Sequence, residues 1–205
     1  MKDPENEKKP PLRISHIVYG RELRKDRVFY FLDPKGEGEK KGIAEQVVLN
    51  RWRKRVSTGW SYGGARLSPN LWRALPMVLG PNADGWGSYS MHELQSIIDS
   101  RRDVLRAKHM SVPAANVLFA LMNVCGNDRL QKLIARHNDP LRKDRYGVPD
   151  LFLYAMNNDT GLPAIARFVE VKKPKEPVSR DQHEEIEFLQ SLGLQARVLR
   201  LIERA

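Results

Sequence analysis

Two short apolar segments near the C-terminal end of the sequence, separated by a turn, carry charged residues where an ordinary core strand would not. The first begins at Asp150 (Asp-Leu-Phe-Leu-Tyr) and the second ends at Lys172 (Ala-Arg-Phe-Val-Glu-Val-Lys). Because alternate side chains of a strand point to the same face of a sheet, Glu170 and Lys172 should lie side by side, with Asp150 on the neighbouring strand. Such charges are costly to bury unless a metal ion or a substrate uses them, so this strand pair should hold a site.

The elements on either side of these strands predict an α/β fold. A capping-box helix from Ser179 and a last strand over 194–202 follow the pair. Upstream, apolar periodicity and helix-start signals predict a helical N-terminal part, with helices over 42–55, from 69, and over 90–108, 113–124 and 128–136. The apolar run 28–32 predicts a strand, and the glycines and aromatic residues of 60–64 predict a loop.

Composition narrows the class of protein. Residues 1–12 are charged and proline-bearing, which predicts a flexible leader or linker before a single domain over 13–205, with its motif-bearing core at 144–205. The formal net charge of +10 favours a polyanionic partner, most simply a nucleic acid. Cys125 is the only cysteine, which excludes a disulfide framework and a cysteine-type zinc site. No apolar run approaches the length of a membrane span, and no signal peptide is visible.

The acidic pair on adjacent strands suggests metal chemistry. Two carboxylates, from Asp150 and Glu170, can hold a hard cation such as Mg²⁺ or Mn²⁺, and the backbone carbonyl of Val171 offers a further ligand. Such a cation neutralises a phosphate and acidifies a bound water, while Lys172 can orient that water or stabilise charge in the transition state. The alternative is a surface aspartate at a strand start beside an exposed cross-strand ion pair.

Four separated motifs occur in a fixed order: Gly-Val-Pro-Asp-Leu, Val-Glu-Val-Lys, Val-Ser-Arg-Asp-Gln, and Leu-Gly before the last strand. Over 146–202 this set resembles the VRR-NUC branch of the PD-(D/E)XK nuclease superfamily. The order of the upstream helices is similar to that in the nuclease domain of the Fanconi-associated nuclease. The resemblance implies a restriction-endonuclease-like core, in which helices flank a mixed central sheet. One departure is Lys173-Pro-Lys-Glu-Pro, where relatives usually carry a Gly-rich or Gly-Pro segment.

The resemblance also implies roles for individual residues. Asp150 and Glu170 resemble the metal ligands of the family, and Lys172 resembles its catalytic lysine. Gln182 is similar to a helix glutamine that supports the site. A capping box with Ser179 is a second explanation of Gln182, compatible with the first.

The family has a further acid on an upstream helix that completes the metal site, and two residues are candidates for it. Glu45 begins a predicted helix stripe that continues with Leu49 and Trp52, although a first-turn glutamate is also favoured by the helix dipole alone. Glu93 fits a capping box with Ser90 and is already explained by it. The similar order of the upstream helices also implies that Glu45 is this acid, and Glu45 is therefore the preferred candidate.

Two functional hypotheses follow: a metal-dependent DNA endonuclease, or a nuclease-like module that binds nucleic acid without cleaving it. Arg101, Arg102 and Lys173 are candidates for phosphate contacts, with a solvated basic surface as the alternative. A compact basic module behind a linker is typical of an antibacterial toxin or effector domain, delivered from a longer protein to act in the cytoplasm of a target cell. Its partner would be an acidic immunity protein. A structure-specific repair nuclease or a phage nuclease is the other setting.

Overall fold

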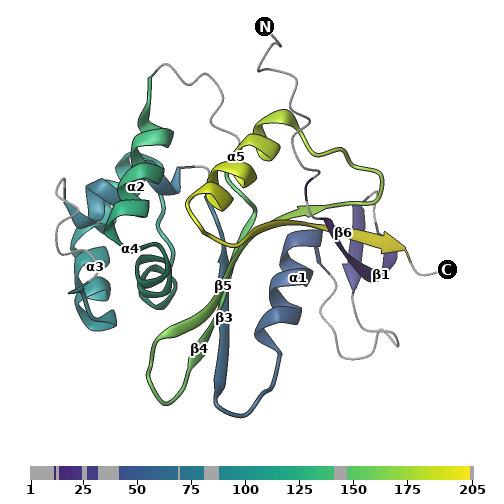
Figure 1. Cartoon of the computed structure of the whole chain (residues 1–205), viewed down its shortest axis with the longest axis horizontal. Helices are drawn as coiled ribbons and strands as arrows, with labels where there is room; N and C mark the ends of the chain where they lie inside the picture. Colours follow the sequence, from purple (N-terminus) through teal and green to yellow (C-terminus); the bar gives the residue numbers. More distant parts are fainter. Residues whose placement is uncertain are drawn as a thin grey trace, which may run out of the picture.

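A mixed β-sheet forms the middle of the protein. The computed structural model describes residues 12, 14–24, 27–31, 42–68, 70–80, 88–140 and 147–203. In this part of the chain, six strands form one sheet in the order β2-β1-β6-β5-β4-β3 (Figure 1). Their bounds are β1 (Ile14–Arg24), β2 (Arg27–Phe31), β3 (Trp60–Arg66), β4 (Leu151–Asn157), β5 (Pro163–Lys172) and β6 (Ala196–Glu203). Strand β6 runs parallel to both of its neighbours, β1 and β5. The other three pairs, β1–β2, β3–β4 and β4–β5, are antiparallel.

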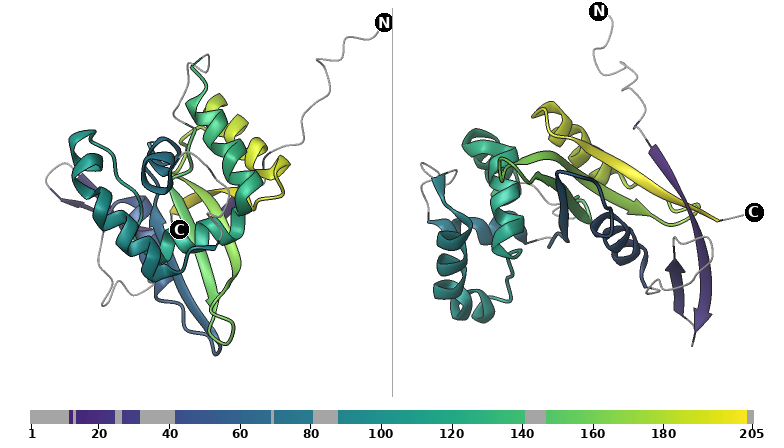
Figure 2. Two further views of the ribbon diagram at one scale, coloured as in Figure 1. Left: turned by 90° about the vertical axis from the view of Figure 1, so that its left-hand side faces the viewer. Right: turned by 90° about the horizontal axis from the view of Figure 1, so that it is seen from below.

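Helices cover both faces of this sheet. They are α1 (Ala44–Arg53), α2 (Leu71–Leu79), α3 (Met91–Ala107), α4 (Ala115–Asn138) and α5 (Arg180–Ser191). The right-hand view of Figure 2 shows α1 and α5 on opposite sides of the strands. Helices α2 and α4 share the hydrophobic core of the α5 side, and α3 packs on α2 and α4.

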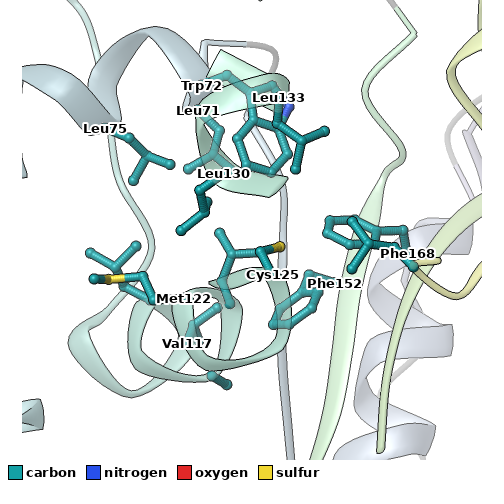
Figure 3. Packing of buried hydrophobic residues seen from close by; sticks show 14 of the residues in the cluster. Leu71, Trp72, Leu75, Val117, Met122, Cys125, Leu130, Leu133, Phe152 and Phe168 are labelled. Atoms are coloured by element: carbon teal, nitrogen blue, oxygen red, sulfur yellow. The ribbon is translucent and has the colours of Figure 1, made fainter. Parts of the chain in front are cut away.

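The larger core lies between the sheet and the helices α2, α4 and α5. Figure 3 shows apolar side chains of α2 and α4 packed toward Phe152 and Phe168. These two phenylalanines are directly opposite each other on β4 and β5, with ring centroids 5.2 Å apart. Fully burying a side chain of this kind contributes about 1.5–3 kcal/mol. The rigid aromatic pair therefore fixes the two strands that carry the charged motif.

The smaller core lies on the other face, under α1. It joins residues of α1 such as Leu49 and Trp52 to Leu153 and Val169 of the sheet. Because side chains alternate along a strand, β5 directs Val169 toward α1 and its even-numbered neighbours toward α5. The sheet thus separates two environments, and Glu170 falls on the α5 side.

Most predicted elements are confirmed. The predicted helices correspond to α1–α5, and the capping boxes that begin α3 and α5 are both formed. The two helices predicted over 113–124 and 128–136 form one element, α4, with non-helical backbone at Gly126. The α/β class with a mixed sheet flanked by helices is also confirmed, although the N-terminal part contributes three strands in addition to its helices.

The loop predicted over 60–64 is wrong, because these residues begin β3. The two glycines that suggested a loop are needed for close packing inside the strand. A Cβ on Gly63 would lie 2.3 Å from the ring of Tyr154, and one on Gly64 would lie 2.6 Å from the carbonyl oxygen of Phe152. Glycine here marks a tight approach between elements, not a turn.

The leader predicted over 1–12 lies outside the described residues except for Leu12, which packs against the larger core. The single-domain boundaries remain a prediction. Among the described helices, none combines the length and the apolar character needed to cross a membrane.

Candidate active site

Asp150 and Glu170 face each other at the point where β4 begins. The antiparallel register pairs Leu151 with Val169, which puts the preceding residue, Asp150, opposite Glu170. Asp150 Oδ2 accepts a hydrogen bond from the backbone N–H of Val171 at 2.8 Å. The Asp150 carbonyl oxygen accepts a second hydrogen bond of 2.8 Å, from the N–H of residue 67. Backbone contacts on both sides therefore fix this carboxylate.

The residues before Asp150 are suited to this position. A Cβ on Gly147 would lie 2.7 Å from the carbonyl oxygen of Asp181, so only glycine lets the chain pass under the start of α5. Pro149 lies directly before Asp150, outside β4. The carbonyl of Val171 points to the same side as its N–H, toward Asp150.

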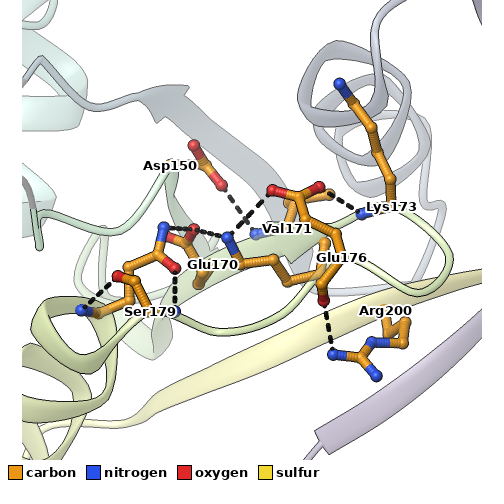
Figure 4. A network of polar contacts seen from close by, with 9 residues as sticks. Asp150, Glu170, Val171, Lys173, Glu176, Ser179 and Arg200 are labelled. Atoms are coloured by element: carbon orange, nitrogen blue, oxygen red, sulfur yellow. Dashed lines mark hydrogen bonds and ion pairs between the residues drawn. The ribbon is translucent and has the colours of Figure 1, made fainter.

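Glu170 and Lys172 form the buried centre of the site, and Figure 4 shows Glu170 within its network of polar contacts. Each is only 4% exposed, and Lys172 Nζ lies 3.2 Å from Glu170 Oε1. The side chain of Gln182 donates a hydrogen bond from Nε2 to the same oxygen at 2.5 Å. Its Oε1 accepts from the N–H of Ser179 at 3.0 Å, which completes the capping box of α5. Gln182 thus contacts Glu170 and closes the capping box at the same time.

A turn after β5 adds a second carboxylate to Lys172. Glu176 Oε1 lies 3.2 Å from Lys172 Nζ, and Glu176 Oε2 accepts from the N–H of Lys173 at 3.1 Å. The turn has Pro174 and then Lys175, whose φ is 61°, a combination typical of a type II turn. The segment that departs from the family pattern therefore forms a defined turn that holds the lysine.

Sequence reasoning missed two residues that hold this arrangement, Glu176 in the turn and Arg200 on β6. Arg200 Nη2 donates to the carbonyl oxygen of Glu176 at 2.9 Å, and β6 pairs Arg200 with Lys172. The parallel pairing of β5 and β6 could not be read from local pattern. A glutamate four residues after a buried lysine was the only available signal for Glu176.

Burial and neighbouring negative charge make both central carboxyl groups more difficult to ionise. Burial and the neighbouring Asp150 charge raise the pKa of Glu170 to about 7, although Lys172 acts in the opposite direction. Burial also raises the pKa of Asp150, and the charge of Glu45 adds to this effect. The site therefore concentrates negative charge that a cation would relieve.

Lys172 behaves differently from these carboxylates. Burial disfavours its ammonium form, but the charges and hydrogen bonds of Glu170 and Glu176 outweigh burial and raise the pKa of Lys172 above its ordinary value. The side chain is therefore a protonated donor at neutral pH, not a base.

Of the two upstream acids, the geometry favours Glu45. It lies in the first turn of α1, near enough for its charge to affect Asp150. Glu93 lies on α3, where its carboxylate accepts a 2.7 Å hydrogen bond from the N–H of Ser90 and closes the capping box. Figure 1 shows α3 on the outer side of the helical layer, away from β5.

The donor set fits a hard divalent cation. Asp150 and Glu170 supply oxygen ligands, with Glu45 and the Val171 carbonyl nearby. Burial and neighbouring negative charge raise the pKa of both carboxyl groups, and a bound cation would favour their ionised forms. Within the described ranges, no three His, Cys, Asp or Glu side chains form a group that could hold a metal ion as they stand. Mg²⁺ commonly binds one or two carboxylates and keeps several waters, so two ligands are sufficient.

The predicted phosphate contacts are not all close to this centre. Lys173 follows Lys172 directly and its side chain is exposed. Arg101 and Arg102 are exposed on α3, and Arg102 forms an ion pair with Asp99. The structure does not bring these two arginines together with the acidic residues.

Comparisons with known proteins agree with this architecture. The family model of the VRR-NUC domain matches residues 91–201. Crystal structures of paFAN1 bound to 5′-flap DNA with a gap are similar to this chain, with a TM-score of 0.54 for both the 2-nucleotide and the 1-nucleotide flap. They are 13% and 14% identical to it, and the alignment covers 96% and 98% of this chain. The chain spans only 38% and 40% of theirs, so the likeness concerns the fold. No curated protein matches the sequence.

Proposed function

Because the chain belongs to the VRR-NUC domain family, we propose that it is a nuclease that hydrolyses phosphodiester bonds of DNA with Mg²⁺ or Mn²⁺. The observation that carries this proposal is the cluster of half-buried Asp150 with buried Glu170 and Lys172. Two carboxyl groups whose pKa values are raised, beside a buried ammonium, cost folding free energy, and a purely structural site would gain nothing from them. The DNA bound by paFAN1 and the net charge of +10 support DNA as the substrate.

The mechanism assigns a separate task to each side chain. Protonated Lys172 can donate to a phosphate oxygen or to the attacking water and stabilise negative charge in the transition state. Gln182 fixes the direction of the Glu170 carboxylate through its 2.5 Å hydrogen bond. Held by the acidic residues described above, the metal ion would supply charge neutralisation of the phosphate and a lower pKa of water. Exposed Lys173, next to this centre, can contact a neighbouring phosphate.

A cleavage assay tests this function. Duplex, single-stranded and 5′-flap DNA are incubated with Mg²⁺, Mn²⁺ or EDTA. Wild type should cleave at least one of them only with metal, and Glu170→Gln, Lys172→Met and Asp150→Asn should each lose about 100-fold or more, as expected for groups that act in the transition state. Asp159→Asn, in the exposed turn after β4, is the matched control and should cleave as wild type does.

Two outcomes would refute the proposal. One is a folded wild type that leaves every DNA form intact with either metal. The other is full activity in Glu170→Gln. DNA binding in EDTA without cleavage under any condition would instead identify a binding module.

For the biological setting, we propose an antibacterial toxin or effector domain that acts in the cytoplasm of a target cell. The basis is the small basic domain itself. Expression in a bacterial cytoplasm should stop growth, and Glu170→Gln should restore it. A cognate immunity protein should be acidic and cover the catalytic face. Normal growth with a soluble wild type that cleaves DNA in vitro would favour a repair or phage nuclease.

A further inference from the structure

A second charged site lies on the opposite face of the sheet. An open pocket of about 650 Å³ is lined by cationic residues from three elements. They are Arg51, Lys54 and Arg55 at the end of α1, Arg167 of β5 and Arg197 of β6. None of its described lining residues is Asp or Glu. The dipole of α1 favours cations at the helix end, but it gives no reason for the two arginines on strands.

The remaining wall of the pocket is apolar. Aliphatic side chains of the sheet and of α1 form it, namely Ile17, Val48, Leu153, Val169 and Leu199. A volume of this size is in the range of small-molecule sites. A ligand that fits both parts combines an anionic group with an apolar or weakly polar one.

The indole ring of Trp52 orders two of the guanidinium groups. Trp52 Nε1 donates to the carbonyl oxygens of Gly63 and Tyr154, at 2.9 Å each, which fixes the indole. Arg55 and Arg167 lie over this ring, with Cζ 5.0 Å and 5.7 Å from its centroid. Cation–π contacts of this kind order an arginine without neutralising its charge.

The position of Arg167 is energetically unfavourable for the folded protein. Its Nε is buried and has no hydrogen-bond partner in the described part of the chain. Burial lowers the pKa of Arg167, and the charges of Arg197 and Arg55 lower it further. A buried donor without a partner and the repulsion between like charges both oppose folding. An anionic ligand would accept a hydrogen bond from Arg167 and would reduce the repulsion between the arginines.

The pocket is separate from the candidate active site. On β5, Arg167 and Val169 face α1, whereas Glu170 and Lys172 face α5, as the alternation of a strand requires. The sheet therefore lies between the pocket and the Glu170–Lys172 pair. Glu45 is on the pocket's side of the sheet, but it lies in the first turn of α1, whereas the pocket is lined by later turns of that helix and the residues after it.

We propose that this pocket binds a nucleotide, with its phosphates among the guanidinium groups and its base against the apolar wall. Arginine pairs with phosphate through two parallel hydrogen bonds, and several arginines suit a multiply charged phosphate chain. The same chemistry is offered by a free nucleotide and by one unit of a nucleic acid strand. Nucleotide binding here goes beyond the proposed cleavage activity, and the pocket contains none of the described residues assigned to cleavage.

Calorimetric titration and thermal unfolding in EDTA test this site with the whole chain. The ligands are dATP, deoxyadenosine, inorganic phosphate, hexathymidylate and a pentaglutamate peptide. The Arg167→Gln/Arg197→Gln variant should bind dATP about 100-fold more weakly, since each charge-assisted hydrogen bond is worth about tenfold or more. Lys108→Gln/Lys132→Gln removes the same charge from exposed positions and should bind as wild type does.

The expected result is that dATP or hexathymidylate binds and raises the melting temperature, whereas deoxyadenosine and phosphate bind at least about tenfold more weakly. Whichever of the two binds more tightly identifies the source of the nucleotide. Binding should persist in Glu170→Gln, which separates this site from cleavage. The proposal is overturned if neither ligand binds, if the folded double variant binds equally well, or if pentaglutamate matches dATP.

Discussion

Glu185 offers a direct test of how α5 is held in place. Its side chain is fully buried, with Oε1 2.7 Å from His137 Nε2 and Oε2 3.0 Å from Arg136 Nε. Both partners lie at the end of α4, so this cluster joins α4 to α5 three residues after Gln182. The substitution Glu185→Gln keeps the shape of the side chain and removes the charge.

The size of the effect follows from the pKa of the carboxyl. Burial alone would raise it, but the hydrogen bonds and charges of His137 and Arg136 lower the pKa of Glu185 from 4.5 to about 2. A difference of roughly 2.5 units at 1.36 kcal/mol each gives about 3 kcal/mol. Because the pKa is depressed in the folded state, this stability is complete above pH 4.5 and is lost as the pH falls toward 2.

Urea unfolding at a series of pH values measures this quantity. Wild type should lose stability steeply below pH 4.5, and Glu185→Gln should be about 3 kcal/mol less stable at pH 7 with a flatter acid limb. Glu184→Gln removes one partner of the exposed Arg180 pair on the same helix and should cost less than about 0.5 kcal/mol. Equal losses in the two variants, or an unchanged acid limb in Glu185→Gln, would refute the reasoning.

Three further substitutions have defined outcomes. Gly147→Ala should lower the free energy of unfolding by about 1–3 kcal/mol, because the new Cβ would lie 2.7 Å from a backbone oxygen. Gly42→Ala, whose Cβ would have its nearest neighbour at 3.6 Å, should not lower it, and urea unfolding of both variants measures the difference. Glu176→Gln should lower the cleavage rate by no more than about tenfold, because Glu170 still forms its ion pair with Lys172. A loss of rate as large as that of Lys172→Met would contradict this prediction. Arg167→Met should raise the melting temperature without ligand, and a lower one would show that the guanidinium stabilises the fold.

The central strand pair could be predicted because its information is local. Period-two alternation alone puts Glu170 beside Lys172, and the motif order supplies Asp150. The capping boxes of α3 and α5 are equally local, since each lies within four residues.

What could not be predicted depends on long-range packing. The choice between Glu45 and Glu93 is set by which helix lies against the start of β4, which no local spacing reveals. The Arg167 and Arg197 pair arises only when β5 and β6 become parallel neighbours. The error at β3 has the same origin, because Gly63 is explained by a tyrosine about ninety residues away.

The amide of Gln182 has a fixed polarity with a consequence for what can replace it. A capping box accepts glutamate as readily as glutamine, since only the acceptor oxygen is needed. Here the oxygen is already engaged by Ser179, so the NH₂ group must be the end that meets Glu170. A glutamate would begin the helix equally well and would set one carboxylate oxygen against another. Glutamate or glutamine can therefore begin α5, but only glutamine can also donate a hydrogen bond to Glu170.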